Sequence, residues 1–151
     1  MLTAKHMEQV IRRYYDGCNE ADVDKMAGCF TPDAVHYFPP GMPGAPFRGA
    51  QTIARSWKQV VEKAGARWTI DALMLDPAAG RGVIEWSNFT HGRNPVVRGT
   101  EWVEFDRDSG RVREIRAYLA APLPRDLERA ELEGFDYAGR GYPLRFPGDA
   151  G

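Results

Sequence analysis

The spacing of apolar residues changes its period once along this chain. Up to about residue 65 the apolar positions recur every three or four residues, which predicts helices, and beyond it they alternate with polar positions, which predicts strands. The helical pattern covers residues 4–19, a short segment after Asp22, and residues 50–64. A short strand at residues 34–38 interrupts it, followed by a proline- and glycine-rich loop, because such residues neither pair in a ladder nor continue a helix.

The second half of the chain predicts a meander of strands. Alternating segments run over residues 67–75, 82–90, 96–105 and 111–121, with short turns between them. Such short connections imply antiparallel neighbours. Three helices can cover one face of this sheet, yet several strands carry apolar residues on both faces. We therefore expect a second subunit to cover the other face, which makes the protein a homodimer.

The composition changes after Pro122. A charged stretch at residues 126–133 is compatible with a short helix, and four aromatic residues among glycines follow it. Two interpretations are open: the segment packs over a pocket mouth or the partner subunit, or it is a surface tail with a few anchors. We expect one domain over residues 1–121 and a C-terminal extension over residues 122–151.

Composition and charge exclude several classes of protein. A chain of 151 residues with 43% hydrophobic content forms one domain with a substantial core. The net charge of −1, with acids and bases interspersed, gives no basic surface for nucleic acid. The N-terminus lacks the apolar core of a signal peptide, and no run has the length of a membrane span. Because Cys18 and Cys29 have no metal or disulfide spacing, we expect a cytoplasmic protein with reduced thiols.

One acidic residue stands out in the third strand of the meander. Alternation places Glu101 on the same face as Gly99, Val103 and Phe105. An ionised carboxylate is costly to bury among such neighbours, so it needs a partner or favours its neutral form. The opposite face carries two charges against this one, which favours an inward Glu101. The alternative places Glu101 in solvent and buries the opposite set.

The order helix, helix, short strand, loop, helix and four-strand meander resembles the NTF2-like superfamily, in particular its SnoaL-like and ketosteroid-isomerase-like branch. The resemblance covers residues 7–121. It implies an α+β cone in which three N-terminal helices pack on a strongly bent antiparallel sheet. The segments that carry it are Arg13-Tyr14, Phe30-Thr31-Pro32-Asp33-Ala34-Val35, Phe47-Arg48-Gly49-Ala50-Gln51-Thr52-Ile53-Ala54 and Gly110-Arg111-Val112-Arg113-Glu114-Ile115-Arg116-Ala117-Tyr118.

The resemblance also implies site residues, with two departures. Ketosteroid isomerases have an oxyanion-binding tyrosine in the first helix, matched by Tyr14, and a protonated aspartic acid on the fourth strand, matched by Glu101. Their proton-shuttling aspartate is replaced here by Phe38, which argues against steroid double-bond isomerisation. Relatives of limonene epoxide hydrolase carry a second acid on the last strand, where this chain has Ala117.

The face shared with Glu101 predicts a mostly aromatic pocket. Its candidate catalytic residues are Glu101 as an orienter or proton donor, His36 as a general base or acid, and Tyr14 and Asn88 as stabilisers of an oxyanion. A structural role in the core is the alternative for His36 and Tyr14. Such a pocket suits a hydrophobic or aromatic small-molecule substrate. The residues expected to form its substrate-binding walls are Phe38, Trp57, Trp86, Ile84 and Ile115.

No cofactor is expected. The three histidines fall in three different elements, so no metal site is predicted, and there is no glycine-rich phosphate loop. We expect a cofactor-independent lyase that removes water, or a small fragment by a retro-aldol-type step, from a hydroxylated aromatic or polycyclic compound. The alternatives are a SnoaL-like or ketosteroid-type isomerase or cyclase, and a non-catalytic binding module.

Overall fold

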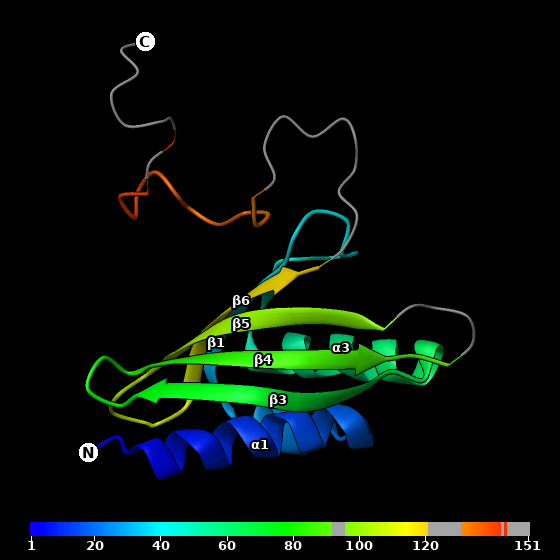
Figure 1. The fold of residues 1–151 in the computed structure, drawn as a ribbon, viewed down its shortest axis with the longest axis horizontal. Coiled ribbons are helices and arrows are strands. Elements are labelled where there is room, and N and C mark those ends of the chain that lie inside the picture. Colours follow the sequence, from blue (N-terminus) through cyan, green and yellow to red (C-terminus); the bar gives the residue numbers. More distant parts are fainter. Residues whose placement is uncertain (92–95, 121–130, 143, 145–151) are drawn as a thin grey trace.

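Three helices lie against one face of a six-stranded sheet in the computed structural model, which describes residues 1–91, 96–120, 131–142 and 144 (Figure 1). The first helix packs along the edge strand β3, and the third packs against β1. This α+β arrangement is the predicted one. The elements are α1 (Ala4–Glu20), α2 (Val23–Ala27), β1 (Phe30–Tyr37), β2 (Phe47–Arg48), α3 (Ala50–Ala64), β3 (Arg67–Asp76), β4 (Arg81–Phe89), β5 (Val97–Phe105) and β6 (Val112–Leu119).

Local signals in the sequence fix the ends of the helices. The Thr3 side chain accepts a hydrogen bond from the backbone N–H of His6 at the start of α1, and Asp22 accepts one from Lys25 at the start of α2. Gly65 ends α3 in the left-handed conformation that glycine adopts without strain. The predicted bounds of α1 and α3 therefore agree with the observed ones to within one residue.

The strand order is β2-β1-β6-β5-β4-β3. The meander from β3 to β6 is antiparallel, as predicted, but β1 pairs with β6 in parallel, so the expectation of a purely antiparallel sheet was wrong at that pair. The parallel pair arises because the chain crosses from β1 through α3 and the whole meander before it returns. The two-residue strand β2 was not predicted, since it is too short to show alternation.

β1 begins at Phe30, four residues before its predicted start. The segment that follows Phe30 contains a proline and looks like a helix stop in the sequence. In the structure the register of β1 against β6 shifts between Phe30 and Val35, and this irregularity accommodates the proline. Further register shifts lie in β3 and between Glu104 and Phe105 of β5, and they bend the sheet around the helices.

The core fills the space between the helices and the inner face of the sheet. Its fully buried members come from both layers and include Met7, Ile11, Met26, Phe30, Ile53, Ile84, Val103 and Ile115. In the described part of the chain, no helix is both long and apolar enough to cross a membrane.

The C-terminal extension contacts the outer face of the sheet. Leu132 and Phe135 form a second buried cluster with Tyr37 of β1, and Arg140 lies over the Phe135 ring at 4.2 Å (Figure 1, orange). Residues 131–133 are not helical, and the rest of the short helix predicted at residues 126–133 lies outside the described residues. The described part of the extension thus covers outer surface of the sheet.

Candidate active site

Glu101 lies on the inner face of β5, opposite Ile84 of β4 and Ala117 of β6. It is only 5% exposed, as the alternation of the strand predicts. Its apolar cross-strand neighbours offer no hydrogen bonds, so the carboxyl group depends on partners from the helices and from β1. The predicted wall residue Ile84 therefore lies directly beside it.

Two polar side chains contact this carboxyl group. The Tyr15 hydroxyl donates a hydrogen bond to Oε2 at 3.1 Å, and His36 Nε2 lies 3.4 Å from Oε1. Tyr15 comes from α1 and His36 from β1, so three separate elements converge here. The structure thus brings the predicted pair of Glu101 and His36 together, with a tyrosine as the third member.

His36 is fully buried in an aromatic surrounding. Its ring stacks on Phe38 with centroids 4.1 Å apart and lies 5.6 Å from the ring of Trp57. Across the parallel pair His36 is opposite Ile115. The walls predicted from Phe38, Trp57 and Ile115 therefore surround the imidazole, and they hold its plane in one orientation.

The tyrosine that reaches Glu101 is Tyr15, and not the predicted Tyr14. The two rings meet edge to face at 5.6 Å, and both are buried. Burial, followed by the nearby charge of Glu101, raises the pKa of Tyr15 well above its usual value, and burial also raises that of Tyr14. Tyr15 follows Ile11 by four residues and precedes Cys18 by three. This spacing places Tyr15 on the buried face of α1, so the sequence pattern could have identified it.

A small cavity adjoins the carboxyl group. It has a volume of about 10 Å³, which is room for about one water molecule. Tyr14 lines this cavity, so it lies near Glu101 without bonding to it, and Trp68 was not among the predicted wall residues. The lining residues are Tyr14, Tyr15, Cys18, Trp57, Trp68 and Glu101.

Asn88 lies apart from this group. It pairs with Val97 near the end of β4, it is half-buried, and its Nδ2 donates to the carbonyl oxygen of Arg67 at 3.4 Å. The alternation of β4 correctly placed it on the face of Ile84 and Trp86. However, the strand carries it four residues beyond Ile84, so the structure does not bring it to Glu101 and His36.

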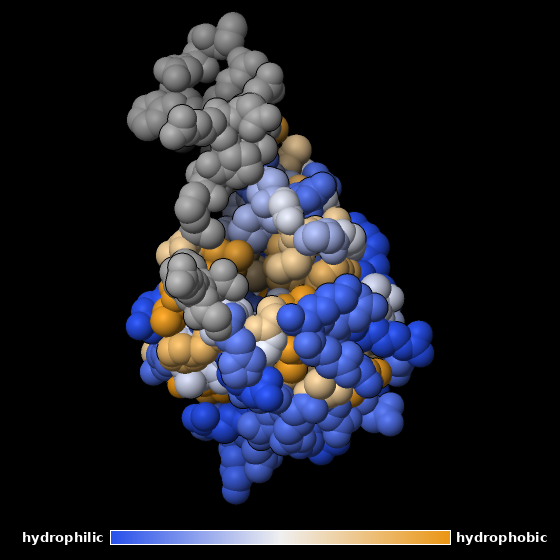
Figure 2. All heavy atoms as spheres, turned by 90° about the vertical axis from the view of Figure 1, so that its right-hand side faces the viewer, coloured by the Kyte–Doolittle hydropathy of each residue, from blue (hydrophilic) through white to orange (hydrophobic). Residues whose placement is uncertain are grey.

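Trp86 lies inward on β4, and its ring covers Gly99 of β5. A Cβ atom at position 99 would lie 2.5 Å from Trp86 Cζ2 and 2.5 Å from the carbonyl oxygen of Tyr118. Only glycine leaves room for this contact. Figure 2 shows the end of the molecule where β4 and α3 finish, with hydrophobic residues gathered around a recess between hydrophilic ones.

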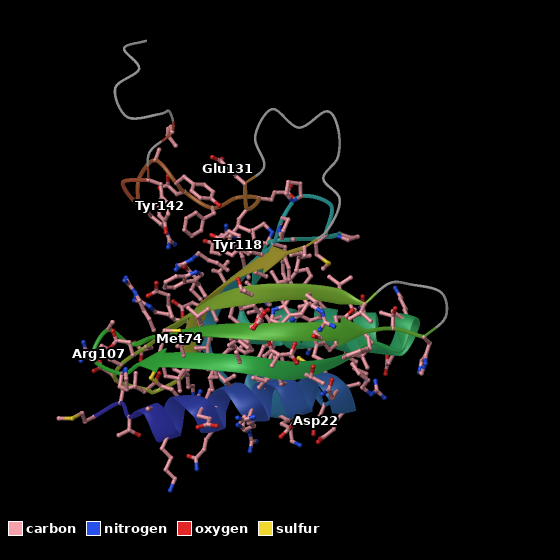
Figure 3. The ribbon with its side chains drawn as sticks, viewed as in Figure 1. Asp22, Met74, Arg107, Tyr118, Glu131 and Tyr142 are labelled. Atoms are coloured by element: carbon pink, nitrogen blue, oxygen red, sulfur yellow. The ribbon has the colours of Figure 1, made fainter. Side chains whose placement is uncertain are left out.

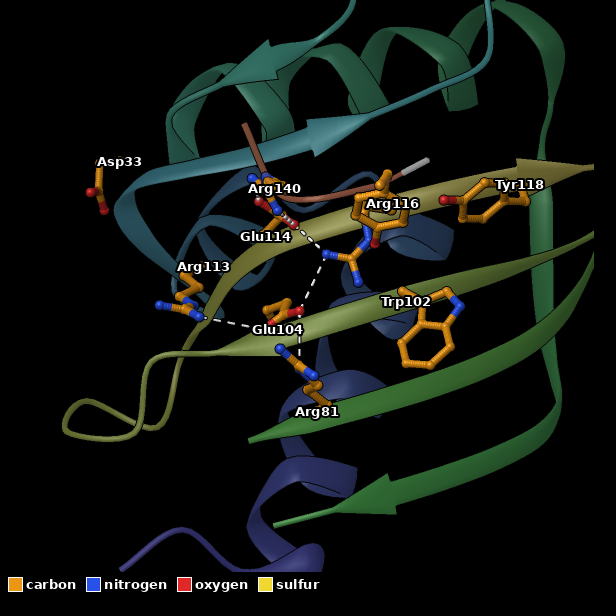
Figure 4. A pocket seen from close by; sticks show the side chains of 10 residues that line it. Asp33, Arg81, Trp102, Glu104, Arg113, Glu114, Arg116, Tyr118 and Arg140 are labelled. Atoms are coloured by element: carbon orange, nitrogen blue, oxygen red, sulfur yellow. Dashed lines mark hydrogen bonds and ion pairs between the residues drawn. The ribbon is translucent and has the colours of Figure 1, made fainter. Parts of the chain in front are cut away.

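A larger hollow, of about 880 Å³, lies on the opposite, outer face of the sheet. Its floor is an ion-pair network in which Glu104 receives Arg81 at 3.2 Å, Arg113 at 3.4 Å and Arg116 at 3.2 Å (Figure 4). Arg116 also pairs with Glu114. Among the residues that line this hollow, four arginines face three acidic residues, Asp33, Glu104 and Glu114, so its described lining is basic on balance.

In the ranges the structure describes, no group of three or more histidine, cysteine, aspartate or glutamate side chains is placed to hold a metal ion. The two cysteines are both free and buried. Burial raises the pKa of the Cys29 thiol to about 11, although the charge of Arg13 opposes the shift.

Comparison with known proteins identifies relatives of this chain. The family described as the SnoaL-like domain matches residues 11–115. A crystal structure of a protein of unknown function with a cystatin-like fold, from Methylobium petroleophilum PM1, is 53% identical; 99% of each chain is covered, with a TM-score of 0.93. A search of curated proteins gave no match.

Two more distant structures share the fold. An NTF2-like protein of unknown function from Mesorhizobium loti is 19% identical, with 78% of this chain and 93% of that chain covered and a TM-score of 0.65. The epoxide hydrolase/cyclase-like enzyme SalBIII, with a role in pyran ring formation in the polyether salinomycin, is 16% identical. That match covers 80% of this chain and 95% of the other, with a TM-score of 0.64.

Proposed function

This chain belongs to the SnoaL-like branch of the NTF2-like superfamily, and from that premise we propose that it is a cofactor-independent acid–base enzyme acting on a hydrophobic small molecule. The observation that carries the proposal is the buried group of His36, Glu101 and Tyr15 inside an aromatic enclosure. A proton acceptor and a carboxyl group 3.4 Å apart, shielded from water, are suited to proton transfer.

The reaction we favour is a lyase reaction on a hydroxylated aromatic or polycyclic compound. In a dehydration, His36 accepts a proton from a substrate carbon, and the freed electron pair forms the new double bond. The leaving hydroxyl group takes a proton from Glu101 and departs as water. The proton then returns from His36 to Glu101, and Tyr15 keeps the carboxyl group in position throughout.

Cyclisation or isomerisation is the alternative reaction class. The same acid and base can return the proton to a different substrate atom, so that nothing is lost from the molecule. The observation that favours it is the structural likeness to an epoxide hydrolase/cyclase-like enzyme that forms a pyran ring. The mass of the product distinguishes the two classes.

We further propose that a second copy of the chain covers the outer face of the sheet. Met74 is 75% exposed there, and Trp102, Tyr118 and Tyr142 are 42%, 39% and 42% exposed. Figure 3 labels Met74, Tyr118 and Tyr142, and Figure 4 labels Trp102. Aromatic side chains so exposed beside an extension that already packs on this face suit a dimer interface. Light scattering coupled to size exclusion should give twice the chain mass, and a Trp102→Glu variant should shift it towards the monomer.

Mass spectrometry tests the catalytic proposal. The protein is incubated with hydroxylated aromatic dimers, steroids and polyketide-like ketones, beside a Glu101→Gln variant and a matched Glu104→Gln variant from the other face of the same strand. A loss of water or of formaldehyde that disappears only in Glu101→Gln supports the lyase, and an unchanged mass with altered retention supports the cyclase or isomerase. Binding without any product refutes catalysis and leaves a binding module.

A further inference from the structure

In the hollow on the outer face of the sheet, arginine side chains are exposed and carboxylates are buried. The side chains of Glu104 and Glu114 are only 9% and 13% exposed. Those of Arg81, Arg113 and Arg140, which pair with them, are 55%, 58% and 37% exposed (Figure 4). A molecule that enters the hollow therefore meets mainly guanidinium groups.

This hollow contains more arginines than its two buried carboxylates need. Glu104 and Glu114 lie directly opposite each other on β5 and β6, where like charges repel. Arg116, which is 6% exposed, bridges them through its Nη1 atom. One further cation would neutralise this pair, yet three more arginines contact it. Stabilisation of the sheet therefore accounts for two of the four arginines.

The exposed guanidinium groups also have donors that no described residue uses. Each guanidinium group carries five N–H donors. Arg113 donates one hydrogen bond to Glu104, through Nη2 at 3.4 Å, and Arg81 approaches the same carboxylate with Nε at 3.2 Å. Asp33, the third acidic residue of the lining, stands outside this ion-pair network (Figure 4). The hollow thus combines unused donors with an excess of positive charge.

The uncharged residues that line the hollow are all aromatic: Trp102, Tyr118 and Tyr142. All three are exposed. Trp102 is the cross-strand partner of Arg116, whose guanidinium carbon lies 5.8 Å from the centre of the indole ring. A flat ligand can stack on such rings while its charged group reaches the arginines. The volume of about 880 Å³ is within the range of small-molecule sites.

We infer that this hollow is a second binding site, for an aromatic compound that carries a carboxylate or a phosphate group. The two groups share the chemistry that the arginines recognise, because both present a pair of oxygen atoms to the parallel N–H donors of a guanidinium. The inference goes beyond the proposed catalytic function, since these residues lie on the face of the sheet opposite Glu101. It holds whether or not the inner face turns over a substrate.

A second copy of the chain is the competing occupant of this hollow. The exposed side chains that we assign to a dimer contact are Met74, Trp102, Tyr118 and Tyr142, and none of them carries a negative charge at neutral pH. Such a surface would remove water from the guanidinium groups without giving them an anionic acceptor, which costs free energy. We therefore expect an anion, and not the second copy, to occupy the hollow.

Calorimetry with matched ligands tests the site. 1-Naphthoate and 1-naphthamide have the same ring and nearly the same shape, and only the first is charged. The wild-type protein should bind 1-naphthoate about tenfold more tightly than the amide, and this preference should shrink as salt is added. 1-Naphthyl phosphate provides the phosphate arm, and its affinity relative to 1-naphthoate shows which of the two groups the arginines prefer.

Variants locate the binding on the outer face. Arg81→Gln and Arg113→Gln each remove an exposed guanidinium group, so each should reduce the preference for the anion to about threefold. Arg55→Gln, at an exposed position of α3, makes the same change in net charge and should leave the preference unchanged, as should Glu101→Gln on the inner face. Trp102→Leu should weaken the binding of 1-naphthyl phosphate and not that of inorganic phosphate, because it removes only the ring.

Three results overturn the inference. The first is equal affinity for 1-naphthoate and 1-naphthamide in the wild type, or an undiminished preference in both arginine variants. The second is failure to bind either anion, and a dimer in light scattering then identifies the second copy as the occupant. The third is binding that depends on Glu101 and not on Arg81 or Arg113, which places the anion on the inner face.

Discussion

Glu101 and Glu104 lie three residues apart on β5 and point to opposite faces of the sheet. They are almost equally buried, at 5% and 7% exposed. Glu104 is held by three guanidinium groups, whereas Glu101 contacts a phenol and an imidazole. Burial alone thus does not distinguish a carboxyl group that stabilises the fold from one that is suited to proton transfer. The partners do, because a guanidinium stays charged while a phenol and an imidazole can exchange protons.

The electrostatics of the outer carboxylate follow from its partners. Burial by itself would raise the pKa of Glu104, but the charges of Arg81 and Arg116 outweigh it and lower that pKa below its usual value. Glu104 is therefore ionised at neutral pH, and its ion pairs tie β4, β5 and β6 together. On the inner face, side-chain nitrogens of His36, Trp57 and Trp86 make no hydrogen bond in the described structure, so a ligand there can add interactions.

The largest contrast is expected from removing the inner carboxylate. Glu101→Gln should reduce kcat by about 10³-fold, because it removes a proton donor and acceptor while keeping the side-chain shape. The free energy of unfolding, measured in urea, should change by less than about 1 kcal/mol, since the amide can still accept from Tyr15. Undiminished turnover in this variant contradicts the role of Glu101.

The matched change on the outer face should do the reverse. Glu104→Gln should lower the free energy of unfolding by about 2 kcal/mol, because Arg116 is buried and keeps only Glu114 as an ionic partner. The kcat value should stay within about twofold of the wild type after correction for folded fraction. A Glu104→Gln protein that is as stable as the wild type but inactive would contradict the assignment of stability to the outer face and catalysis to the inner face.

Tyr14 and Tyr15, which are adjacent on α1, are expected to contribute unequally to kcat. Tyr15→Phe removes the hydrogen bond to Oε2 of Glu101 and should lower kcat about tenfold, with KM little changed. Tyr14→Phe should have a smaller effect, since Tyr14 only lines the cavity. Steady-state kinetics of both variants measures this, and a larger loss in Tyr14→Phe would return the oxyanion role to the residue that the family resemblance indicated.

The smallest effect is expected in the pH dependence of stability. The pKa of Glu104 is lower in the folded than in the unfolded chain, so its stabilisation is complete above the unfolded value of 4.5. It is lost as the pH falls through the lower, folded value. Urea unfolding at a series of acidic pH values should therefore show a steeper decline for the wild type than for Glu104→Gln. An equal dependence of the unfolding free energy on pH in the two proteins would contradict the stabilising ionic role of Glu104.

The sequence predicted what depends on periodicity. Alternation along β5 correctly placed Glu101 on the inner face, and the spacing of apolar residues gave the bounds of α1 and α3 to within one residue. The parallel pairing of β1 with β6 could not be predicted in this way, because it joins segments almost eighty residues apart whose own patterns are the same in either direction. The family resemblance covers the fold well, and it does not fix which catalytic groups each member keeps.

The site was predictable only in part, for a related reason. His36 and Glu101 followed from the parity of two strands, but the choice between Tyr14 and Tyr15 depends on how α1 is rotated over the sheet. Adjacent helical residues differ by about 100° around the axis, and both positions are buried here. The lack of a hydrogen-bond partner at the indole Nε1 atoms of Trp57 and Trp86 could not be predicted, because it depends on which groups the fold places around them.

The parallel pairing of β1 with β6 has a consequence for how the protein matures. His36 is fixed in the sheet by its pairing with Ile115, a residue near the end of the folded domain. β1 therefore cannot complete its pairing until β6 is present. Contacts between segments so far apart in the sequence form late, which makes closure of the sheet a slow step in folding. A nascent or truncated chain that lacks β6 has no strand to hold His36 opposite Ile115. Under the proposed function, proton transfer therefore becomes available only after β6 has been synthesised.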